Sequence, residues 1–406
     1  MANKNIGGGK LSGLRGLVTT AGLCLALAGS AGGLRAADVP AGPGVQTLRV
    51  PDGGLYPQAQ LDPGGRLHLI YFKGNPMRGD IYYVRSADFG ATFSRALRVN
   101  SQPESCILTG TVRGPQMAVG NAGRVHVAWM GSDKALPRAK GRQTPMLYAR
   151  LNDAGDAFEP QRNLVQNYPG LDGGGSVAAD EEGNVYVAWH APRKEENEAD
   201  RHVWLVRSRD QGKTFSSETM ADPEPAGVCG CCGMRIFAGG GKGEVYVLYR
   251  SALEKVNRDM RLLTSNDYGQ TFKVALVDPW RIGQCVMSTS AFSRAAGERA
   301  LASWETKQQV YFATVGADRS STVKPTPAPG QGRNRKHPSV AANGKGEFIV
   351  AWTEETGWEK GGLVAWQVFD RDGQPIAGQS GRVDGLPVWS APAAFADRAG
   401  GFKILY

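Results

Sequence analysis

The sequence has little cysteine, little helix-like periodicity and no long apolar run beyond its start. Six of its 406 residues are cysteine. No stretch after the N-terminal segment is apolar and long enough to span a bilayer, so we expect no membrane span. Basic residues form no run typical of nucleic-acid binding, so we expect no nucleic-acid partner. Fifty-five glycines and few helix-like periods instead favour an all-β chain with many turns.

The N-terminal segment has the organisation of a secretory signal peptide. Basic residues precede an apolar stretch, LVTTAGLCLALAGSAG, and small residues follow it before Asp38. That apolar part is too short to span a membrane comfortably. We expect residues 1–37 to be the signal peptide, with cleavage between Ser30 and Ala37. The predicted location of the mature protein is therefore periplasmic or secreted.

The remaining chain is mildly basic and undivided. The leader takes four basic residues and no acidic residue with it, so the formal net charge falls from +9 to +5. A small positive charge favours acidic ligands, such as carboxylated sugars, only weakly. No linker or shift in composition divides residues 38–406, and we expect them to form a single domain.

One octapeptide occurs three times. The copies SADFGATF, SRDQGKTF and SNDYGQTF begin at Ser86, Ser208 and Ser265, and a decayed copy, LNDAGDAF, begins at Leu151. Successive copies start 65, 57 and 57 residues apart. Repetition at such a period indicates stacked supersecondary units. Each copy lies between two strand-like runs, which predicts a hairpin turn fixed by its Ser, Asp and Gly, with its Phe packed between neighbouring sheets.

A second pattern recurs with the same period: an alternating strand, a tight turn with glycine, and a second strand rich in aromatic residues. It predicts seven inner hairpins, at residues 57–72, 114–130, 175–190, 234–250, 288–305, 338–355 and 391–406. The octapeptides then join the outer strand pairs of the first, third and fourth units. The last hairpin reaches the C-terminus without an outer pair, so we expect the strand TLRVP at 47–51 to complete it.

The octapeptide resembles the Asp-box, or bacterial neuraminidase repeat, of the sialidase superfamily. The blade pattern extends the resemblance over nearly all of the chain after the leader. It implies an all-β fold, a β-propeller of four-stranded antiparallel blades. The sialidase family has six blades, whereas this chain has seven inner hairpins. We predict seven blades closed by pairing of the N- and C-terminal strands, with six as the alternative.

The resemblance also implies a ligand face and an activity. In Asp-box propellers the boxes lie on one rim, and ligands bind on the opposite face near the axis. Catalytic sialidases hold the substrate carboxylate with three arginines and use a Tyr activated by a Glu as nucleophile, with an Asp as acid/base. The corresponding loops of this chain offer a candidate catalytic set: Tyr56, Arg113, Arg235, Arg250 and Glu305. The implied function is an exo-glycosidase acting on acidic, sialic-acid-like glycans.

The arginine motif of the family is missing from its usual place. The family carries its first arginine in a Phe-Arg-Ile-Pro motif ahead of the first box. The nearest string here, Met234-Arg235-Ile236-Phe237, lacks the proline and follows two intact boxes. The chain is thus a divergent case. The alternative function is a non-catalytic binding or scaffold propeller whose partner is a glycan, a small molecule or a periplasmic protein.

All five cysteines that remain after the leader lie in loops that precede inner hairpins. Cys229, Cys231 and Cys232 fall within four residues, Cys285 precedes the next hairpin, and Cys106 precedes the second. Cysteines placed for packing would be scattered over strands. Their convergence on one face therefore indicates a site.

Two interpretations of the cysteines involve disulfides. An extracytoplasmic compartment permits a bridge between adjacent loops, from Cys229 or Cys232 to Cys285. Because five is an odd number, at least one cysteine then stays unpaired or pairs outside the chain. Alternatively, a redox-active vicinal disulfide between Cys231 and Cys232 shapes a ligand pocket.

The third interpretation is a thiolate metal site. Soft sulfur ligands favour Cu(I) or Zn. The candidate ligands are Cys229, Cys231, Cys232 and Cys285, with His190 or His337 in addition. The CxCC spacing does not match the usual CxxC zinc knuckle, so the spacing by itself does not specify a metal.

Overall fold

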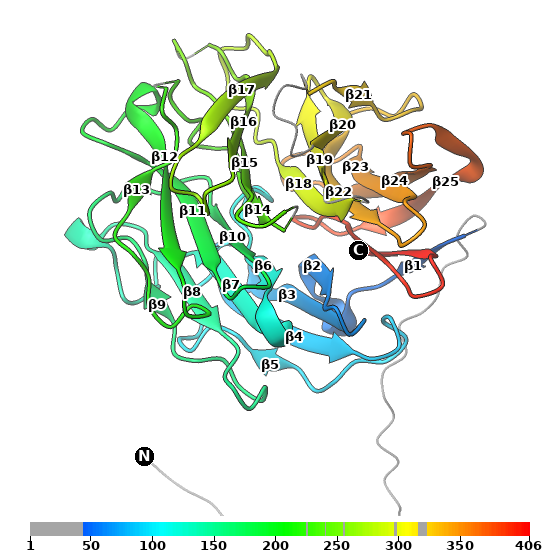
Figure 1. Cartoon of the computed structure of the whole chain (residues 1–406), viewed down its shortest axis with the longest axis horizontal. Helices are drawn as coiled ribbons and strands as arrows, with labels where there is room; N and C mark the ends of the chain where they lie inside the picture. The colour runs from blue at the N-terminus through cyan, green and yellow to red at the C-terminus, as the bar shows by residue number, and fades with distance from the viewer. Residues whose placement is uncertain (1–43, 225, 240, 255, 296–298, 316–322) are drawn as a thin grey trace, which may run out of the picture. The chain divides into compact units, whose positions relative to one another are not determined.

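The described part of the chain folds into seven β-sheets arranged in a ring (Figure 1). The computed structural model describes residues 44–406 except 225, 240, 255, 296–298 and 316–322. The predicted signal peptide lies outside the described residues. A search of the described residues finds no helix that is long and apolar enough to cross a membrane.

Each sheet, or blade, is built from strands that follow one another along the chain. The inner strands, which line the middle of the ring, are β2 (Leu55–Leu61), β6 (Gln116–Val119), β10 (Gly175–Ala179), β14 (Arg235–Ala238), β18 (Ser290–Ala295), β22 (Lys336–Ala342) and β26 (Ala393–Ala396). The second strands are β3 (Leu67–Asn75), β7 (Val125–Met130), β11 (Val185–Pro192), β15 (Val245–Arg250), β19 (Arg299–Thr306), β23 (Phe348–Glu354) and β27 (Phe402–Leu405). These fourteen strands are the seven predicted inner hairpins.

The outer strands complete the blades. The third strands are β4 (Arg78–Ser86), β8 (Met146–Arg150), β12 (Arg201–Ser208), β16 (Met260–Ser265), β20 (Gln309–Val315) and β24 (Gly362–Phe369). The fourth strands are β5 (Leu97–Arg98), β9 (Arg162–Asn163), β13 (Thr219–Met220), β17 (Lys273–Asp278), β21 (Thr326–Pro327) and β25 (Pro375–Leu386). Four short 3₁₀ turns occur in the described residues: η1 (Pro51–Gly53), η2 (Asn121–Gly123), η3 (Lys140–Arg142) and η4 (Glu198–Asp200).

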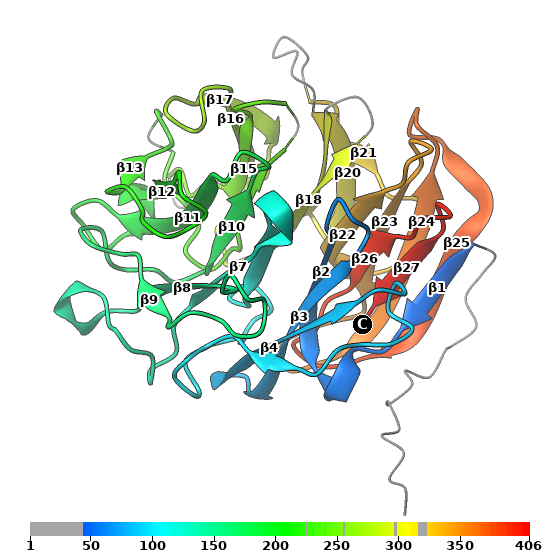
Figure 2. The ribbon, with the colours of Figure 1, turned by 60° about the horizontal axis from the view of Figure 1, so that its bottom comes forward.

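The seventh blade closes the ring with a strand from the start of the chain. Strand β1 (Val45–Leu48) pairs with β27, as predicted, and the two lie side by side in Figure 2. This blade has three strands in the order β1-β27-β26, and the β1–β27 pair is parallel. The direction follows from the connection, because β1 must end on the face where β2 begins, and β27 ends on that same face.

The three intact octapeptides form the same turn. In the third blade, Ser208 Oγ accepts a hydrogen bond from the Gly212 N–H at 2.8 Å. Asp210 accepts from the Thr214 N–H at 2.9 Å and from the Thr214 hydroxyl at 2.7 Å. Gln211 and Gly212 have φ values of 57° and 79°, the left-handed pair of a tight hairpin turn. The turn chemistry read from the sequence is confirmed.

The Phe that ends each octapeptide packs against a neighbouring sheet. Phe215 of the third blade meets Tyr148 of the second edge-on, with ring centroids 4.9 Å apart. Phe158 of the second blade meets Tyr83 of the first at 5.5 Å. The core is therefore divided among the interfaces between adjacent blades, and these two aromatic contacts each join two sheets.

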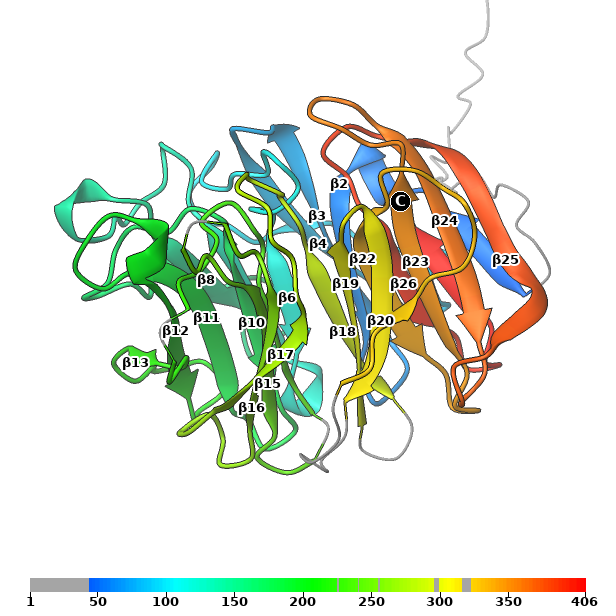
Figure 3. The ribbon, with the colours of Figure 1, turned by 90° about the horizontal axis from the view of Figure 1, so that it is seen from above.

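The strand order gives the ring two distinct faces. Antiparallel strands alternate in direction, so the loops before the inner strands emerge on one face and the octapeptide turns on the other; Figure 3 shows the blades from the edge of the ring. We call these the Cys face and the box face. The Cys face carries the cysteine loops before β14 and β18.

Candidate functional site

Four cysteine sulfurs converge on the Cys face between the fourth and fifth blades. Cys229 Sγ lies 3.0 Å from Cys232 Sγ and 3.5 Å from Cys231 Sγ. The three Sγ atoms all lie within 4.8 Å of one another. Cys231 forms a disulfide with Cys285. The structure therefore gathers the four cysteines of the predicted set into one cluster, which we call the sulfur cluster.

The disulfide differs from both predicted pairings. We expected Cys229 or Cys232 to bond with Cys285, or Cys231 to bond with Cys232. Cys229 and Cys232 instead point inward and are 0% and 3% exposed. Cys231 is only partly buried and meets the exposed Cys285 from the neighbouring loop. The bond thus joins the two cysteines on the outer side of the cluster.

Cys106 stays apart from the cluster. It is fully buried, and its backbone forms isolated β-bridges with Gly79 and Gly131, between the first two blades. Burial raises the pKa of its thiol well above the usual range. This cysteine has the environment of a core residue.

The cysteine loop is fixed from several sides. The Cys229 N–H donates to the Arg250 carbonyl at 2.9 Å, and the Gly233 N–H donates to the Ser288 carbonyl at 3.0 Å. The Gly230 N–H donates to Glu198 Oε1 at 2.8 Å, and Glu198 in turn pairs with Arg258. Backbone hydrogen bonds to three separate segments hold the loop in place before any ligand binds.

A glycine allows the third blade to approach this loop. A Cβ atom at Gly173 would lie 2.5 Å from both the Cys232 and the Gly230 carbonyl oxygens. Real Cβ atoms do not come that close to backbone atoms. Any other residue at this position would push the cysteine loop outward.

The two free thiols of the cluster differ in acidity. The hydrogen bond with Cys232 and burial both raise the pKa of Cys229. Burial also acts to raise the pKa of Cys232, but the hydrogen bond from Cys229, the Arg250 guanidinium and contacts with Ser288 lower it. The Cys229 thiol donates to the Cys232 sulfur, and this bond favours the thiolate form of Cys232 over that of Cys229. Thiolates are the form that binds metals and attacks disulfides.

The two candidate histidines lie outside the cluster. His190 Nε2 accepts from the Gly173 N–H at 3.2 Å, and Arg201 lies 3.2 Å from its Nδ1. His337 Nδ1 lies 3.2 Å from the Thr289 hydroxyl. Burial lowers the pKa of His190 well below its usual value and that of His337 to about 3. Both are neutral histidines with polar partners of their own.

An axial cavity of about 470 Å³ runs between the inner strands. Tyr56, Arg235 and His337 line its Cys-face end. Bulges at the starts of β2 and β22 shift the strand register there, and Tyr56 and His337 have φ values of 52° and 48°. Such bulges redirect side chains, in this case toward the axis. Arg235 donates to the Ser290 carbonyl at 3.0 Å and to Gln58 at 3.3 Å, and burial lowers its pKa.

Loops from four blades meet over the Cys-face end of this cavity. The Met287 methyl group lies 2.2 Å from where a Cβ at Gly110 would be. The Val112 carbonyl oxygen would lie 2.8 Å from a Cβ atom built at Gly174 and 3.2 Å from a Cβ atom built at Gly233. These loops therefore lie in close contact with one another on the Cys face, and Tyr56 and His337 at that end of the cavity are buried. Exposed lining residues occur instead at the box-face end.

The other three candidate catalytic residues do not line the cavity. Arg113 pairs with Asp172 at 2.8 Å. Arg250 is buried and donates to Ser288 Oγ at 2.8 Å and to the carbonyls of Arg258 and Glu305. These two arginines connect loops. The structure thus places Tyr56 and Arg235 on the axial cavity and Arg113, Arg250 and Glu305 outside its lining.

Glu305 has a buried carboxyl group. Its Oε1 accepts from the Gln308 N–H at 2.9 Å. Its Oε2 has no hydrogen-bond partner among the described residues. Burial raises its pKa. Its backbone carbonyl accepts from Arg250, so it supports the same arginine that lies beside the sulfur cluster.

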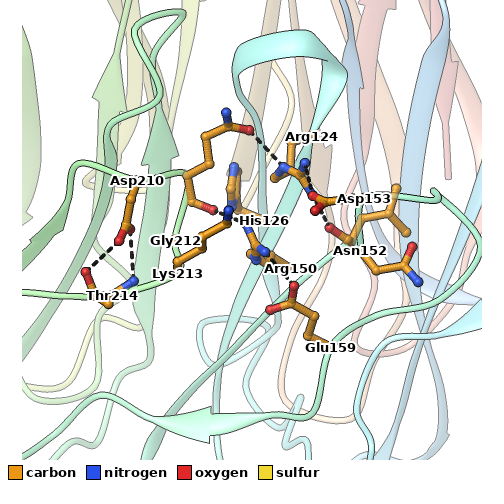
Figure 4. A network of polar contacts seen from close by, with 12 residues as sticks. Arg124, His126, Arg150, Asn152, Asp153, Glu159, Asp210, Gly212, Lys213 and Thr214 are labelled. Carbon is orange, nitrogen blue, oxygen red and sulfur yellow. Dashed lines mark hydrogen bonds and ion pairs between the residues drawn. The ribbon is translucent and has the colours of Figure 1, made fainter.

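A polar network on the box face surrounds the decayed octapeptide of the second blade (Figure 4). Arg124 donates to the Leu151 carbonyl at 2.7 Å, to Asp153 and to Gln211 Oε1 at 2.9 Å. Arg150 donates to Glu159 at 2.6 Å and to the Gln211 carbonyl at 3.0 Å. The two arginines tie the decayed turn to the intact turn of the next blade. The sequence feature that marks this network is the octapeptide LNDAGDAF, which has lost the Ser and Thr of the intact copies.

Comparison with known proteins identifies the fold. No family model and no curated protein matches the chain. A solved protein of unknown function from Dyadobacter fermentans shares 14% identity over 78% of this chain and 94% of its own, with a TM-score of 0.53. The α-L-arabinofuranosidase Arb93A from Fusarium graminearum shares 13% over 84% and 98%, with a TM-score of 0.50. The NanB sialidase from Streptococcus pneumoniae shares 11% over 87% and 65%, with a TM-score of 0.45.

Likeness at these identities shows the fold and no more. The chain is a seven-bladed β-propeller, and the arabinofuranosidase Arb93A is among the solved proteins that it resembles in structure. Among the described residues, the sulfur cluster is the group of side chains that could hold a metal ion.

Proposed function

We propose that this propeller is exported and binds a thiophilic metal ion, Cu(I) or Zn²⁺, at its sulfur cluster. The observation that carries the proposal is the placement of three cysteine Sγ atoms within 4.8 Å of one another, with Cys285 bonded to one of them. Metal–sulfur bonds of about 2.3 Å in a tetrahedron set the sulfurs about 3.8 Å apart. The separations of 3.0 and 3.5 Å from Cys229 to its neighbours require only small movements to reach that spacing.

The surroundings of the cluster suit a metal thiolate. Trp280 and Val286 pack against Cys229 and Cys232 and keep water away. The Arg250 guanidinium lowers the pKa of Cys232, and a positive group beside thiolates offsets their negative charge. Ser288 Oγ lies 3.7 Å from Cys232 Sγ, as an outer partner that orients a ligand sulfur. Soft ligands in a dry setting favour Cu(I) or Zn²⁺ over Mg²⁺ or Ca²⁺.

Metal analysis of the mature protein, reduced and loaded without oxygen, tests the proposal. We expect bound copper or zinc, and loss of that metal in Cys229→Ser and Cys232→Ser. Cys106→Ser is the matched control, because it removes a buried free thiol outside the cluster. If the protein binds neither metal while its cluster thiols are free, the proposal is wrong.

A divergent glycosidase is the second candidate, favoured by the pairing of Tyr56 with Arg235 at the end of the axial cavity. A partly buried guanidinium attracts a carboxylate. Release of 4-methylumbelliferone from a sialoside, abolished by Arg235→Ala, would support this activity. Absence of turnover across a panel of glycosides would exclude it.

A further inference from the structure

We propose that the Cys231–Cys285 disulfide selects which metal the cluster binds. With the disulfide formed, the cluster offers two sulfurs and binds Cu(I). With the disulfide reduced, it offers four sulfurs and binds Zn²⁺. This inference rests on the proposed metal-binding function and specifies how that site is regulated.

The oxidised cluster has the ligand set of a two-coordinate ion. Cys229 and Cys232 remain outside the disulfide, their sulfurs lie 3.0 Å apart, and both are buried. The cluster found among the described residues contains cysteine only, with no His, Asp or Glu within the same group. Cu(I) is stable with two thiolates, whereas structural Zn²⁺ takes four ligands. A disulfide sulfur is a poor ligand for either ion.

Reduction completes a four-sulfur set without moving the loops. Cys231 Sγ already lies 3.5 Å from Cys229 Sγ. The loop that carries Cys285 is anchored independently of its disulfide. Lys336 Nζ donates to the Val286 carbonyl at 2.6 Å, and the Ser288 carbonyl accepts from the Gly233 N–H at 3.0 Å. Once the bond is broken, Cys285 therefore stays next to the other three cysteines.

The exposure of the cysteines matches this division of roles. Cys285 is exposed and Cys231 is partly buried, whereas Cys229 and Cys232 lie beneath them. A reductant can therefore reach the disulfide without first meeting the inner thiol pair. The Cys231–Cys285 bond takes two electrons and two protons from a dithiol, which becomes a disulfide, and two cysteine thiols form. A disulfide oxidant reverses the step.

The test compares metal binding by the folded mature protein in two redox states. One sample keeps the disulfide; the other is reduced with a phosphine, which is then removed under anaerobic conditions. Cu(I) is titrated against bathocuproine disulfonate, and Zn²⁺ is titrated against a chromogenic chelator. We expect the oxidised protein to take up one Cu(I) and no Zn²⁺, and the reduced protein to gain one Zn²⁺.

Two variants sharpen the comparison. The double variant Cys231→Ser with Cys285→Ser cannot form the disulfide. It should bind Cu(I) and no Zn²⁺, with or without phosphine treatment. Cys106→Ser should behave as the unaltered protein. Circular dichroism and melting temperature check that each variant is folded. Zn²⁺ binding that is equal in both redox states, or that survives in the double variant, overturns this inference alone. Absence of both metals in every state overturns the proposed function itself.

Discussion

At the scale of single residues, Gly173 shows how a position without chemistry of its own controls the site. It lies between His190, which accepts its N–H, and the carbonyls of the cysteine loop. The absence of a side chain lets the third blade support the loop of the fourth. The position of the sulfurs therefore depends partly on the absence of a Cβ atom at Gly173.

Replacement of Gly173 by Ala tests this role. The new Cβ would lie 2.5 Å from two backbone oxygens, so the loop must shift, and we expect metal affinity to fall about 10- to 100-fold, as for the loss of a supporting contact. Gly344→Ala is the control, because a Cβ there meets nothing within 4 Å. Competition titration measures both variants. Unchanged affinity in Gly173→Ala would show that the contact does not position the cluster.

The residue scale also shows where the sequence ceases to be informative. It predicted that the cysteines share one face, because the repeat fixes which loops do so. It did not predict their pairing, since Cys229, Cys231 and Cys232 are so close in the chain that small turns decide which sulfur faces outward. Nor did it predict the partners of Arg250, because the sequence around a loop arginine does not show whether its guanidinium binds a ligand or donates to backbone carbonyls.

At the scale of elements, the decayed octapeptide shows how a turn is kept after its own bonds are lost. The turn at 151–158 has no Ser or Thr at the usual positions. Instead, Asn152 bonds with Asp156 inside the turn, and Arg124 holds the turn from outside (Figure 4). The decay of the motif in sequence therefore coincides with a different set of hydrogen bonds in the same hairpin.

Removal of the Arg124 side chain should weaken the contact between the second and third blades. Arg124→Ala leaves the Leu151 carbonyl and Gln211 without their donor, and we expect a loss of about 1–3 kcal/mol in the free energy of unfolding. Arg124→Lys should restore only part of the loss, because one ammonium group cannot reproduce the planar fork. Denaturant unfolding measures both. Full rescue by Lys would show that charge, and not geometry, supports the turn.

The blades themselves could be predicted in order and number, since glycine turns and aromatic strands recur at a steady period. The direction of β1 could not be predicted from its residue pattern, because alternation is the same in a parallel and an antiparallel pair; it follows instead from the connection to β2. The close contacts among the Cys-face loops were also not predicted. These loops carry no repeat, and their path depends on contacts such as Met287 with Gly110.

At the scale of the whole molecule, buried neutral histidines set the response to acid. Burial lowers the pKa of both His126 and His337 to about 3, against a usual 6.5. Below pH 6.5 the unfolded chain binds protons that the folded chain does not. Stability therefore falls as the pH drops from about 6.5 toward 3 and is not lost further below that value.

We expect the free energy of unfolding to fall by about 2 kcal/mol for each of these two histidines between pH 7 and pH 5. Guanidinium denaturation at intervals of half a pH unit measures the slope. His126→Gln should lose its share of the slope while it can still bond to the Tyr148 hydroxyl, the partner that lies 2.7 Å from His126 Nδ1. A variant with the same slope as the unaltered protein would contradict the assignment.

The pairing of β1 with β27 also determines the order in which the molecule can be finished. Val45 pairs with Phe402, so synthesis delivers β1 long before its partner strand. Until then β1 is an unpaired edge, available to other chains. The six complete blades can form from local hairpins, whereas closure depends on a contact between strands far apart in the sequence, a kind of contact that forms slowly. A chain that stops short of β27 therefore cannot close the ring through β1.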